Sequence, residues 1–489
     1  MMNILGDYYP ILLMLVFVTV VFRLLPKTDV GHSPAYNRRR LMNWLPLGLT
    51  YALLYMGRYN LKVSQYAFEE IAGPDGSPLM GNAGFGIIFM VGTIVYGVSF
   101  LINGPLTDRM GGRFSILLGA GGAMFMNLLM GLASLSLTKH GPFYDVLAGN
   151  FIPIFSVLYA LNMYFQSFGA VAIVKVNAPW FHVRERGVFG AIFGILISLG
   201  IYLAFDVGYK ILGGLGLVWV FFMPALLLAV FWVLDFFIVR NSPAEAGQGK
   251  FNTGDATSGD DGPRLGAVVV FKKMLSNPII LTIAGVEFCS GFLRQAIMQW
   301  YGSFAKQTDG VLGLKSSFVN ENWGMMLFFA GVLGGMLAGT ISDHLFQSRR
   351  GPVAGVLYGF MLVCAVVLTF TYTTPMVGWL VVFMSMAVIG VHGMLSGTAS
   401  MDFGGAKNAG IAVGIIDGFV YLGTGLMSLT YALVLPKVQL DDAGHIIGPA
   451  TDPANWKAWP LAMIPLAALG FILALRLWNA KPKPKTKTA

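Results

Sequence analysis

Cysteine is scarce in this chain, which has only two among its 489 residues. Cys289 and Cys364 both lie within apolar stretches, and they lack the close spacing of a zinc-binding motif. The sequence therefore supports neither a disulfide framework nor a metal centre. We expect both cysteines to be packing residues.

Charged residues are scarce as well. Only 11% of the residues are charged and 56% are hydrophobic, whereas about 25% of the residues in a typical soluble domain are charged. Uncharged apolar runs long enough to cross a bilayer recur along the whole chain. The composition excludes a soluble globular protein and predicts an all-α membrane protein with many spans.

Acidic residues are the scarcer of the two charge types, with 23 Asp and Glu against 32 Lys and Arg and a net charge of +9. In a soluble protein this surplus would suggest nucleic-acid binding. Here the basic residues gather in short connections between apolar runs, which is the pattern of cytoplasmic loops. We therefore expect no nucleic-acid partner. The basic connections contain Arg109 and Arg113, Arg349 and Arg350, Lys407, and the tail at 481–489.

The first apolar run, at residues 8–25, follows a single acid, Asp7, and precedes an arginine cluster at 38–40. This asymmetry predicts that the run starts outside and ends in the cytoplasm. A cleaved signal peptide would need basic residues before the run and small residues after it, and neither is present. We expect an extra transmembrane helix and linker at 1–36.

Twelve further apolar runs follow. They lie near residues 41–66, 84–104, 113–135, 149–174, 188–212, 217–239, 278–302, 323–342, 352–373, 376–400, 408–435 and 458–478. A polar connection at 241–277 separates six of them from the other six. We therefore expect two six-helix halves, at 37–240 and 278–480, joined by a cytoplasmic loop and followed by a basic cytoplasmic tail at 481–489.

A short motif occurs once in each half, after the second span. Its members are Gly104, Asp108, Arg109 and Arg113 in the first copy and Gly339 and Asp343 in the second. We expect the glycine to allow close helix approach, and the charged residues to pair with helix ends across the bundle. One copy alone could be a solvated charged loop, but two copies in register favour a conformational motif.

Two arginines interrupt apolar runs at corresponding places in the halves. Arg58 lies in the first span of the first half and Arg294 in the first span of the second. An arginine at the centre of a bilayer costs about 2.5–3.5 kcal/mol on insertion scales, so it is kept where it faces water or a partner. Together the two predict a clamp for an anion. Either one alone could instead pair with a carboxylate or reach a lipid headgroup.

Several other polar residues lie within the spans. Glu287 lies two helical turns before Arg294, so we expect it to neutralise that arginine, with proton coupling or a purely structural ion pair as alternatives. Lys175 could recruit anions or extend to the membrane surface. Asp417 and Tyr421 could read substrate hydroxyls. His392 could titrate in a cavity or simply pack. The remaining candidates are Tyr55, Tyr59, Tyr96, Gln295 and Trp300.

The motif at residues 104–113 resembles the loop signature of the major facilitator superfamily. Within that superfamily, four stretches are similar to the organophosphate:phosphate antiporter family. They are Arg58-Tyr59-Asn60, the arginine-then-tryptophan stretch at 292–300, the aromatic pair and Glu-Arg-Gly at 180–187, and Arg240 with the Pro and Gly that follow it up to residue 247.

This resemblance implies a major facilitator fold with two six-helix halves related by a pseudo-two-fold axis. It further implies a monomeric rocker-switch carrier in a bacterial inner membrane, surrounded by lipid, that needs no cofactor and no metal. Arg58 and Arg294 would hold the phosphate of an organophosphate that is exchanged for inorganic phosphate. Their planar guanidinium groups suit this because they bind phosphate oxygens in pairs and keep their charge when desolvated.

The sequence departs from the family at three positions. A histidine of the fifth helix falls on Ile197, a lysine of the second on Phe100 and a glutamate of the eighth on Phe328. The arginine pair is thus kept in more apolar surroundings, and the organic part of the substrate is left unassigned.

Two other functions compete with exchange. The same family includes sugar-phosphate receptors that signal to a kinase, although no signalling module is evident in the short tail or the central loop. A proton-coupled carrier of a drug or sugar is the second alternative, and it would depend on the acids more than on the arginines. No nucleophile with a matching base stands out, so we expect no enzyme.

Overall fold

The computed structural model describes residues 2–24, 30–182, 185–249, 275–347, 349–399 and 409–480, together with residues 269, 271 and 272. Much of the predicted central loop and the tail at 481–489 lie outside these residues. The described chain is almost entirely helical. One antiparallel pair of short strands, β1 (Gln439–Leu440) and β2 (Ile446–Ile447), is the exception among the described residues.

The first long helix of the bundle is α2 (Pro34–Phe68), which has 35 residues and is about 52 Å long. Its start is set locally, because Ser33 accepts a hydrogen bond from the backbone N–H of Tyr36 and Pro34 occupies the first turn, where no N–H partner is needed. The same device, with Asn277 and Pro278, begins the longest helix of the second half, α11 (Pro278–Gln307). Both arginine-bearing helices therefore have well-defined starts.

The helices divide into two groups. The first group contains α2, α3 (Asn82–Met110), α4 (Gly112–Lys139), α5 (Tyr144–Gly149), α6 (Phe151–Asn177), η1 (Ala178–Trp180), α7 (Arg186–Tyr202), η3 (Leu203–Val207), α8 (Gly208–Leu215), α9 (Leu217–Ile238) and η4 (Ala244–Ala246). The second contains α11, α12 (Asp309–Leu312), α13 (Phe318–Glu321), α14 (Trp323–Thr340), η5 (Ile341–Leu345), α15 (Arg350–Thr371), α16 (Val377–His392), η6 (Gly393–Ala399), α18 (Ala409–Val434), η7 (Gly448–Thr451), η8 (Pro453–Trp456), α19 (Ala458–Leu461) and α20 (Met463–Arg476).

Within the described residues, 11 helices are long and apolar enough to cross a membrane. The helix α2 is long enough but is not among them, because buried polar side chains such as Asn43, Asn60 and Lys62 lower its hydropathy. Eleven of the twelve predicted spans thus have matching apolar helices, and the twelfth coincides with the long helix α2. The helices extend beyond several of the predicted apolar runs, since helix ends reach past the hydrocarbon layer.

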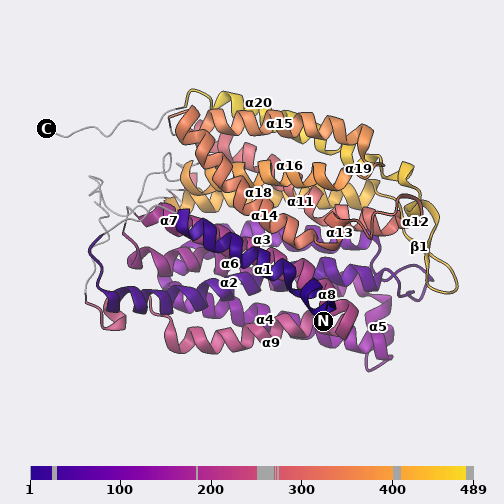
Figure 1. The fold of residues 1–489 in the computed structure, drawn as a ribbon. Helices are drawn as coiled ribbons and strands as arrows, with labels where there is room; N and C mark the ends of the chain where they lie inside the picture. The colour runs from indigo at the N-terminus through magenta and orange to yellow at the C-terminus, as the bar shows by residue number, and fades with distance from the viewer. Residues whose placement is uncertain are drawn as a thin grey trace.

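The two groups lie side by side, with the first below and the second above in Figure 1. They meet mainly through α3 against α18 and α7 against α14. We name the end of the bundle where α2 and α11 both finish the Glu69 end. The opposite end, where α2 begins, is the Arg40 end. In Figure 1 the Glu69 end is on the right, beside α12 and β1.

The helix α3 approaches α18 so closely that glycine is needed. A Cβ atom on Gly97 would lie 3.0 Å from the carbonyl oxygen of Gly418. The close approach predicted for Gly104 is wrong for this structure, because a Cβ there would meet no atom within 4 Å. The glycines that permit contact between the groups lie earlier in α3, where the two helices are pressed together.

The charged members of the repeated motif are only partly described. The guanidinium of Arg113 donates one hydrogen bond to the carbonyl of Phe236 in the last turn of α9, and its backbone N–H donates to Oδ1 of Asn241 at 2.8 Å. This matches the predicted pairing with a helix end. Arg109 is exposed. The side chains of Asp108 and Asp343 lie outside the described part, as does Lys407.

An additional helix, α1 (Met2–Leu24), precedes the bundle. The hydroxyl of Tyr9 donates to Asn322 at 2.6 Å, and Phe17 packs edge-on against Phe329 of α14 with ring centroids 5.0 Å apart. Tyr9 also lies close enough to Tyr202 of α7 to interact electrostatically. The helix α1 therefore contacts the second group at α14 and lies near α7 of the first (Figure 1). That it spans the membrane stays a prediction.

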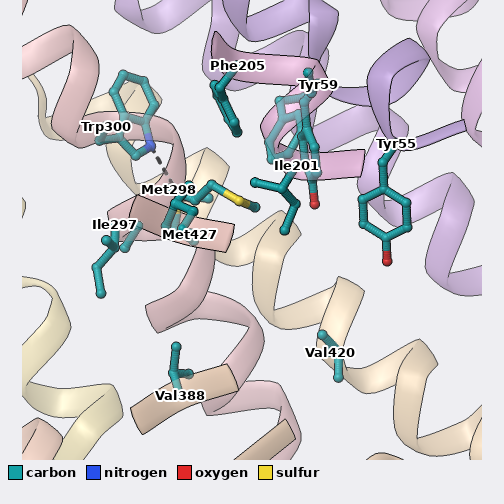
Figure 2. Close-up of a cluster of buried hydrophobic side chains, with 14 of the residues drawn as sticks. Tyr55, Tyr59, Ile201, Phe205, Ile297, Met298, Trp300, Val388, Val420 and Met427 are labelled. Carbon is teal, nitrogen blue, oxygen red and sulfur yellow. Dashed lines mark hydrogen bonds between the residues drawn. The ribbon is translucent and has the colours of Figure 1, made fainter. Parts of the chain in front are cut away.

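The apolar core continues across the boundary between the groups. Figure 2 shows Tyr59 and Phe205 of the first group facing Met298, Trp300 and Met427 of the second. The indole N–H of Trp300 donates to the sulfur of Met427 at 3.2 Å. This shared core surrounds the two arginine-bearing helices.

Candidate functional site

Arg58 lies in the interior of the bundle with 1% of its surface exposed. Its guanidinium donates three hydrogen bonds, and all three acceptors are neutral. They are Gln166 at 3.0 Å, Tyr421 at 3.1 Å and Tyr96 at 2.7 Å. No carboxylate among the described residues forms an ion pair with it. The charge of Arg58 is therefore solvated by dipoles and remains available to an anion.

A network of amides fixes the position of Arg58. Asn162 and Asn127 both donate to the carbonyl of Gly57, at 3.0 and 3.3 Å. Asn162 also accepts from Gln166 at 3.1 Å. Gln166, which accepts from the guanidinium, is thus held in place by Asn162 of the same helix, α6. The sequence reading missed these residues, although Asn162 and Gln166 are spaced four apart on one face of an apolar helix, which was a readable signal.

Arg294 lies on α11, partly exposed, opposite α18. The nitrogen Nε of Arg294 is buried and has no hydrogen-bond partner in the described chain. Its helix is held tightly against α18, because a Cβ on Gly291 would collide with the carbonyl of Val420. Buried donors without a partner are rare in folded proteins, and each calls for an explanation. A bound anion would supply the missing acceptor.

Tyrosines surround both arginines. Tyr421, Tyr59 and Tyr55 lie close enough to interact electrostatically with Arg58 and with Arg294. The guanidinium of Arg58 also lies over the rings of Tyr55 and Tyr96, 4.6 and 4.4 Å from the centroids. The side-chain amide of Gln295 donates to the hydroxyl of Tyr59 at 3.0 Å, which joins the two groups.

These contacts bring most of the predicted site together. Arg58, Arg294 and the predicted tyrosines form one cluster, which we call the arginine cluster. Phe100, which replaces a lysine of the resembling family, stacks on Tyr421 at 5.9 Å. Phe328 lies away from the cluster, with its ring 6.3 Å from that of Phe17 in α1.

That Glu287 neutralises Arg294 stays a prediction, because among the described residues the ion pair of Glu287 is with His392 and not with Arg294. Glu287 is fully buried, and its oxygen Oε2 lies 2.7 Å from Nδ1 of His392. Seven residues of helix separate Glu287 from Arg294 by about 10.5 Å along the axis, too far for contact although both lie on one face. Glu287 still acts on Arg294 electrostatically. His392, which could have been a simple packing residue, has a carboxylate partner.

Asp417 accepts a hydrogen bond from the hydroxyl of Ser396, so its nearest partner is in η6. It interacts electrostatically with His392, Glu287 and Arg294. The two acids, the histidine and Arg294 therefore form one electrostatic unit in the second group. The described residues contain no group of three or more His, Cys, Asp or Glu placed to hold a metal ion.

Trp300 has no exposed surface and packs against Phe85 and Tyr431, with centroids 5.4 and 5.7 Å apart. That Trp300 faces the substrate stays a prediction. Lys175 is exposed near the end of α6. It lies at the Arg40 end and not in the arginine cluster.

Lys62 was missed by the sequence reading. It lies one turn after Arg58 with 2% of its surface exposed, and its ammonium donates to Gln65 at 2.7 Å and to Ser303 at 2.6 Å. The same ammonium lies over the ring of Trp300, 4.8 Å from the centroid. The signal was present in the sequence, since a second cation follows Arg58 by four residues.

A further set of bonds joins the groups at the Glu69 end. Lys306 of α11 forms ion pairs with Glu69 at 2.8 Å and Glu70 at 2.7 Å. Gln307 donates to Glu69 at 3.0 Å and exchanges hydrogen bonds with Asn82. Across the described residues, the hydrogen bonds between α2–α9 and α11–α20 lie at the level of the arginines or closer to the Glu69 end. That end is closed.

At the Arg40 end, a separate cluster lies outside the spans. The carboxylate of Glu185 accepts hydrogen bonds from Arg40 at 2.9 and 3.0 Å and lies 3.1 Å from Nε2 of His32. Burial alone would raise the pKa of Glu185, but the backbone N–H of His182 and these two side chains outweigh burial and lower it. The linker before α2 is thereby tied to the connection between α6 and α7.

The family model of the Major Facilitator Superfamily matches residues 47–428. The chain belongs to the Major Facilitator Superfamily. The match covers the part of α2 that carries Arg58 and the whole of α11, which carries Arg294, together with the helices between them. This superfamily is a family of transporters and not of enzymes, and the chain is a secondary transporter with a multi-pass fold.

Curated relatives are distant. The glycerol-3-phosphate transporter of Bacillus subtilis is 25% identical over 92% of this chain and 95% of its own length. The probable hexose phosphate transport protein of Chlamydia pneumoniae is 24% identical over 82% of this chain and 84% of its own. The membrane sensor protein UhpC of Escherichia coli is 25% identical over 93% and 95%. Transporters and a sensor are thus similarly distant.

Solved structures support the fold alone. A mutant of the nucleoside transporter NupG matches with a TM-score of 0.60 and 13% identity, covering 90% of this chain and 98% of its own. The D-xylose-proton symporter matches with a TM-score of 0.59 and 17% identity over 91% and 99%. The predicted major facilitator fold is therefore confirmed.

Proposed function

We propose that this transporter carries a phosphorylated small organic molecule across the membrane in exchange for inorganic phosphate. The proposal rests on the hydrogen bonding of the two arginines. Arg58 has only neutral hydrogen-bond partners, and Arg294 has a buried Nε without one. Two cations inside the bundle that form no ion pair with a carboxylate among the described residues are costly unless an anion binds between them.

Phosphate suits this arrangement in shape as well as charge. A guanidinium binds two oxygens side by side and stays protonated in a dry site. The hydroxyls of Tyr96 and Tyr421 already lie beside Arg58, where they can donate to the remaining phosphate oxygens. The named relatives that transport glycerol 3-phosphate or hexose phosphate support the same class of substrate.

Alternating access follows from where the bonds between the groups lie. We place the Arg40 end in the cytoplasm, because the basic connections gather there. The bonds of Lys306 then close the outer end, and substrate would exchange with the cytoplasm in this conformation. An anion between Arg58 and Arg294 would draw the groups together and so permit the switch to the outward-open form. A bacterial inner membrane is the proposed location.

The similarity to UhpC makes a sensor the second candidate. A sensor would bind an organophosphate through the same arginines without transporting it at a useful rate. Transport measurements therefore separate the two. Binding without exchange would favour the sensor.

The deciding experiment uses purified protein in liposomes loaded with phosphate and a panel of labelled organophosphates outside. We expect exchange with at least one of them. Arg58→Lys and Arg294→Lys should each reduce exchange by at least tenfold, since lysine keeps the charge but loses the paired donors. The exposed Arg476, changed to Lys, is the matched control. Normal exchange by either folded site variant would overturn the proposal.

A further inference from the structure

The second group contains three titratable side chains that the anion clamp does not use. Glu287 comes from α11, His392 ends α16 and Asp417 lies in α18. They are brought together by helix packing, with His392 Nδ1 2.7 Å from Glu287 Oε2. Asp417 interacts electrostatically with both. Glu287 and Asp417 also interact electrostatically with Arg294.

One atom of this cluster is unpartnered. Oε1 of Glu287 is buried and accepts no hydrogen bond in the described chain, although the whole side chain has no exposed surface. The histidine is 25% exposed, so the cluster has contact with its surroundings through His392. A fully buried carboxylate with one free oxygen is a position where a proton can bind.

The groups around the cluster set its charge. Those that face it among the described residues are Arg294 and Cys289 on α11, Tyr358 on α15, His392 on α16, Ser396 on η6 and Asp417 on α18. Arg294 is the one permanent cation of this set. An anion bound at Arg294 would offset the positive charge of the arginine. The carboxylates of Glu287 and Asp417 would then lie in a more negative potential.

We propose that Glu287, His392 and Asp417 form a proton-binding site that is coupled to anion binding at Arg294. The proton enters through His392 and is held between the histidine and the two carboxylates. Because the anion repels the unprotonated carboxylates, anion and proton bind with positive cooperativity, and each strengthens the other by the same factor. This inference rests on the proposed anion site, but it adds a second transported species that exchange alone does not require.

The test measures the affinity of labelled phosphate for the solubilised protein from about pH 6 to about pH 8. Phosphate itself titrates in this range, but that contribution is common to all variants. One linked proton changes affinity by up to about tenfold per pH unit. We expect the wild type to lose affinity with rising pH more steeply than Glu287→Gln, His392→Gln and Asp417→Asn. Identical slopes in all proteins would overturn the coupling and leave the anion site standing.

The matched control is Asp235→Asn. Asp235 is also a buried acid within a span, but it belongs to the first group and accepts from Thr50 at 2.7 Å. Its phosphate affinity should fall with rising pH as steeply as that of the wild type. An Asp235→Asn slope as shallow as that of Glu287→Gln would overturn the assignment to this cluster. A wild type that binds no phosphate would instead overturn the proposed function and this inference with it.

A second measurement needs only the wild type, in case a variant fails to fold. Infrared difference spectra at fixed pH report protonated carboxyl groups directly. Adding phosphate should increase the absorption of protonated carboxyls if binding draws in a proton. No increase, with phosphate bound, would overturn the proposal. Glu287→Gln, where it folds, should lose part of the signal.

Discussion

The ammonium nitrogen of Lys62 lies 2.6 Å from the hydroxyl oxygen of Ser303, and this hydrogen bond crosses from the first helix group to the second. Both residues are buried. Arg58 and Arg294 lie on the same two helices, nearer to the middle of the bundle. The two helices that carry the arginines are therefore also joined to each other by a hydrogen bond on the Glu69 side of the arginines.

Ser303→Ala should destabilise this conformation by about 1–3 kcal/mol, because it leaves a buried ammonium donor without its acceptor. Thermal unfolding in detergent measures the effect as a lower Tm. The matched control is Thr369→Ala, which removes an exposed hydroxyl bonded within its own helix. An unchanged Tm for Ser303→Ala would mean that water replaces the hydroxyl.

Lys306→Ala should open the Glu69 end. Removing one partner of a buried ion pair costs about 3–5 kcal/mol, and Glu69 has no exposed surface. Spin labels at Val146→Cys and Val311→Cys, both exposed near this end, should move apart. The native cysteines are buried, so labelling is confined to the introduced ones.

The control for Lys306→Ala is Lys315→Ala, because Lys315 is an exposed lysine of the same end and has no ion pair among the described residues. Its label distances should match those of the parent protein. Equal distances in Lys306→Ala and the parent would show that the ion pairs with Glu69 and Glu70 do not hold this end closed.

The sequence allowed the span pattern and the arginine pair to be predicted, because a cation in a long apolar run has few explanations. The hydrogen-bond partners of Arg58 could not be predicted from the sequence. Which face of α6 meets α2 depends on helix rotation in the packed bundle, and so does the contact of Gln166 with the guanidinium. The ion pair of Glu287 with His392 could not be predicted for the same reason, since His392 belongs to a different helix.

Lys62 shows a different limit. Its spacing from Arg58 was readable, but a lysine near the end of an apolar run usually extends its amine to the membrane surface. Here Ser303 of a helix more than 200 residues later supplies the acceptor. The family resemblance could not help, because it identified motifs and not contacts between the groups.

Glu185→Gln should lower stability at neutral pH and have less effect in acid. The pKa of Glu185 is lowered from its ordinary 4.5 in the folded protein, so the carboxylate stabilises the fold above that value, and the benefit is lost as the pH falls through the lowered pKa. The Tm values of variant and wild type, measured from about pH 7 to about pH 3, should therefore differ at neutral pH and draw together only below the ordinary pKa of 4.5. Glu321→Gln, which changes an exposed acid, should track the wild type throughout.

Gly97→Val should hinder the contact of α3 with α18, because a side chain there meets the carbonyl of Gly418. Exchange should slow while insertion is retained, and the labels on Val146 and Val311 should report a more open Glu69 end. Gly335→Ala is the control, since a Cβ at that position meets no atom within 4 Å. Unaltered exchange in Gly97→Val would show that the helices can part by the width of a side chain.

The position of α1 has a consequence for how the protein is made. Tyr9 and its partner Asn322 are separated by 313 residues. Synthesis proceeds from the N-terminus, at roughly 5–20 residues per second, so α1 leaves the ribosome well before its docking surface on α14 exists. It must wait in the cell without that partner until the second group has been produced. Docking of α1 is thus one of the late steps of assembly, and the contact between Tyr9 and Asn322 marks a chain whose second group is in place.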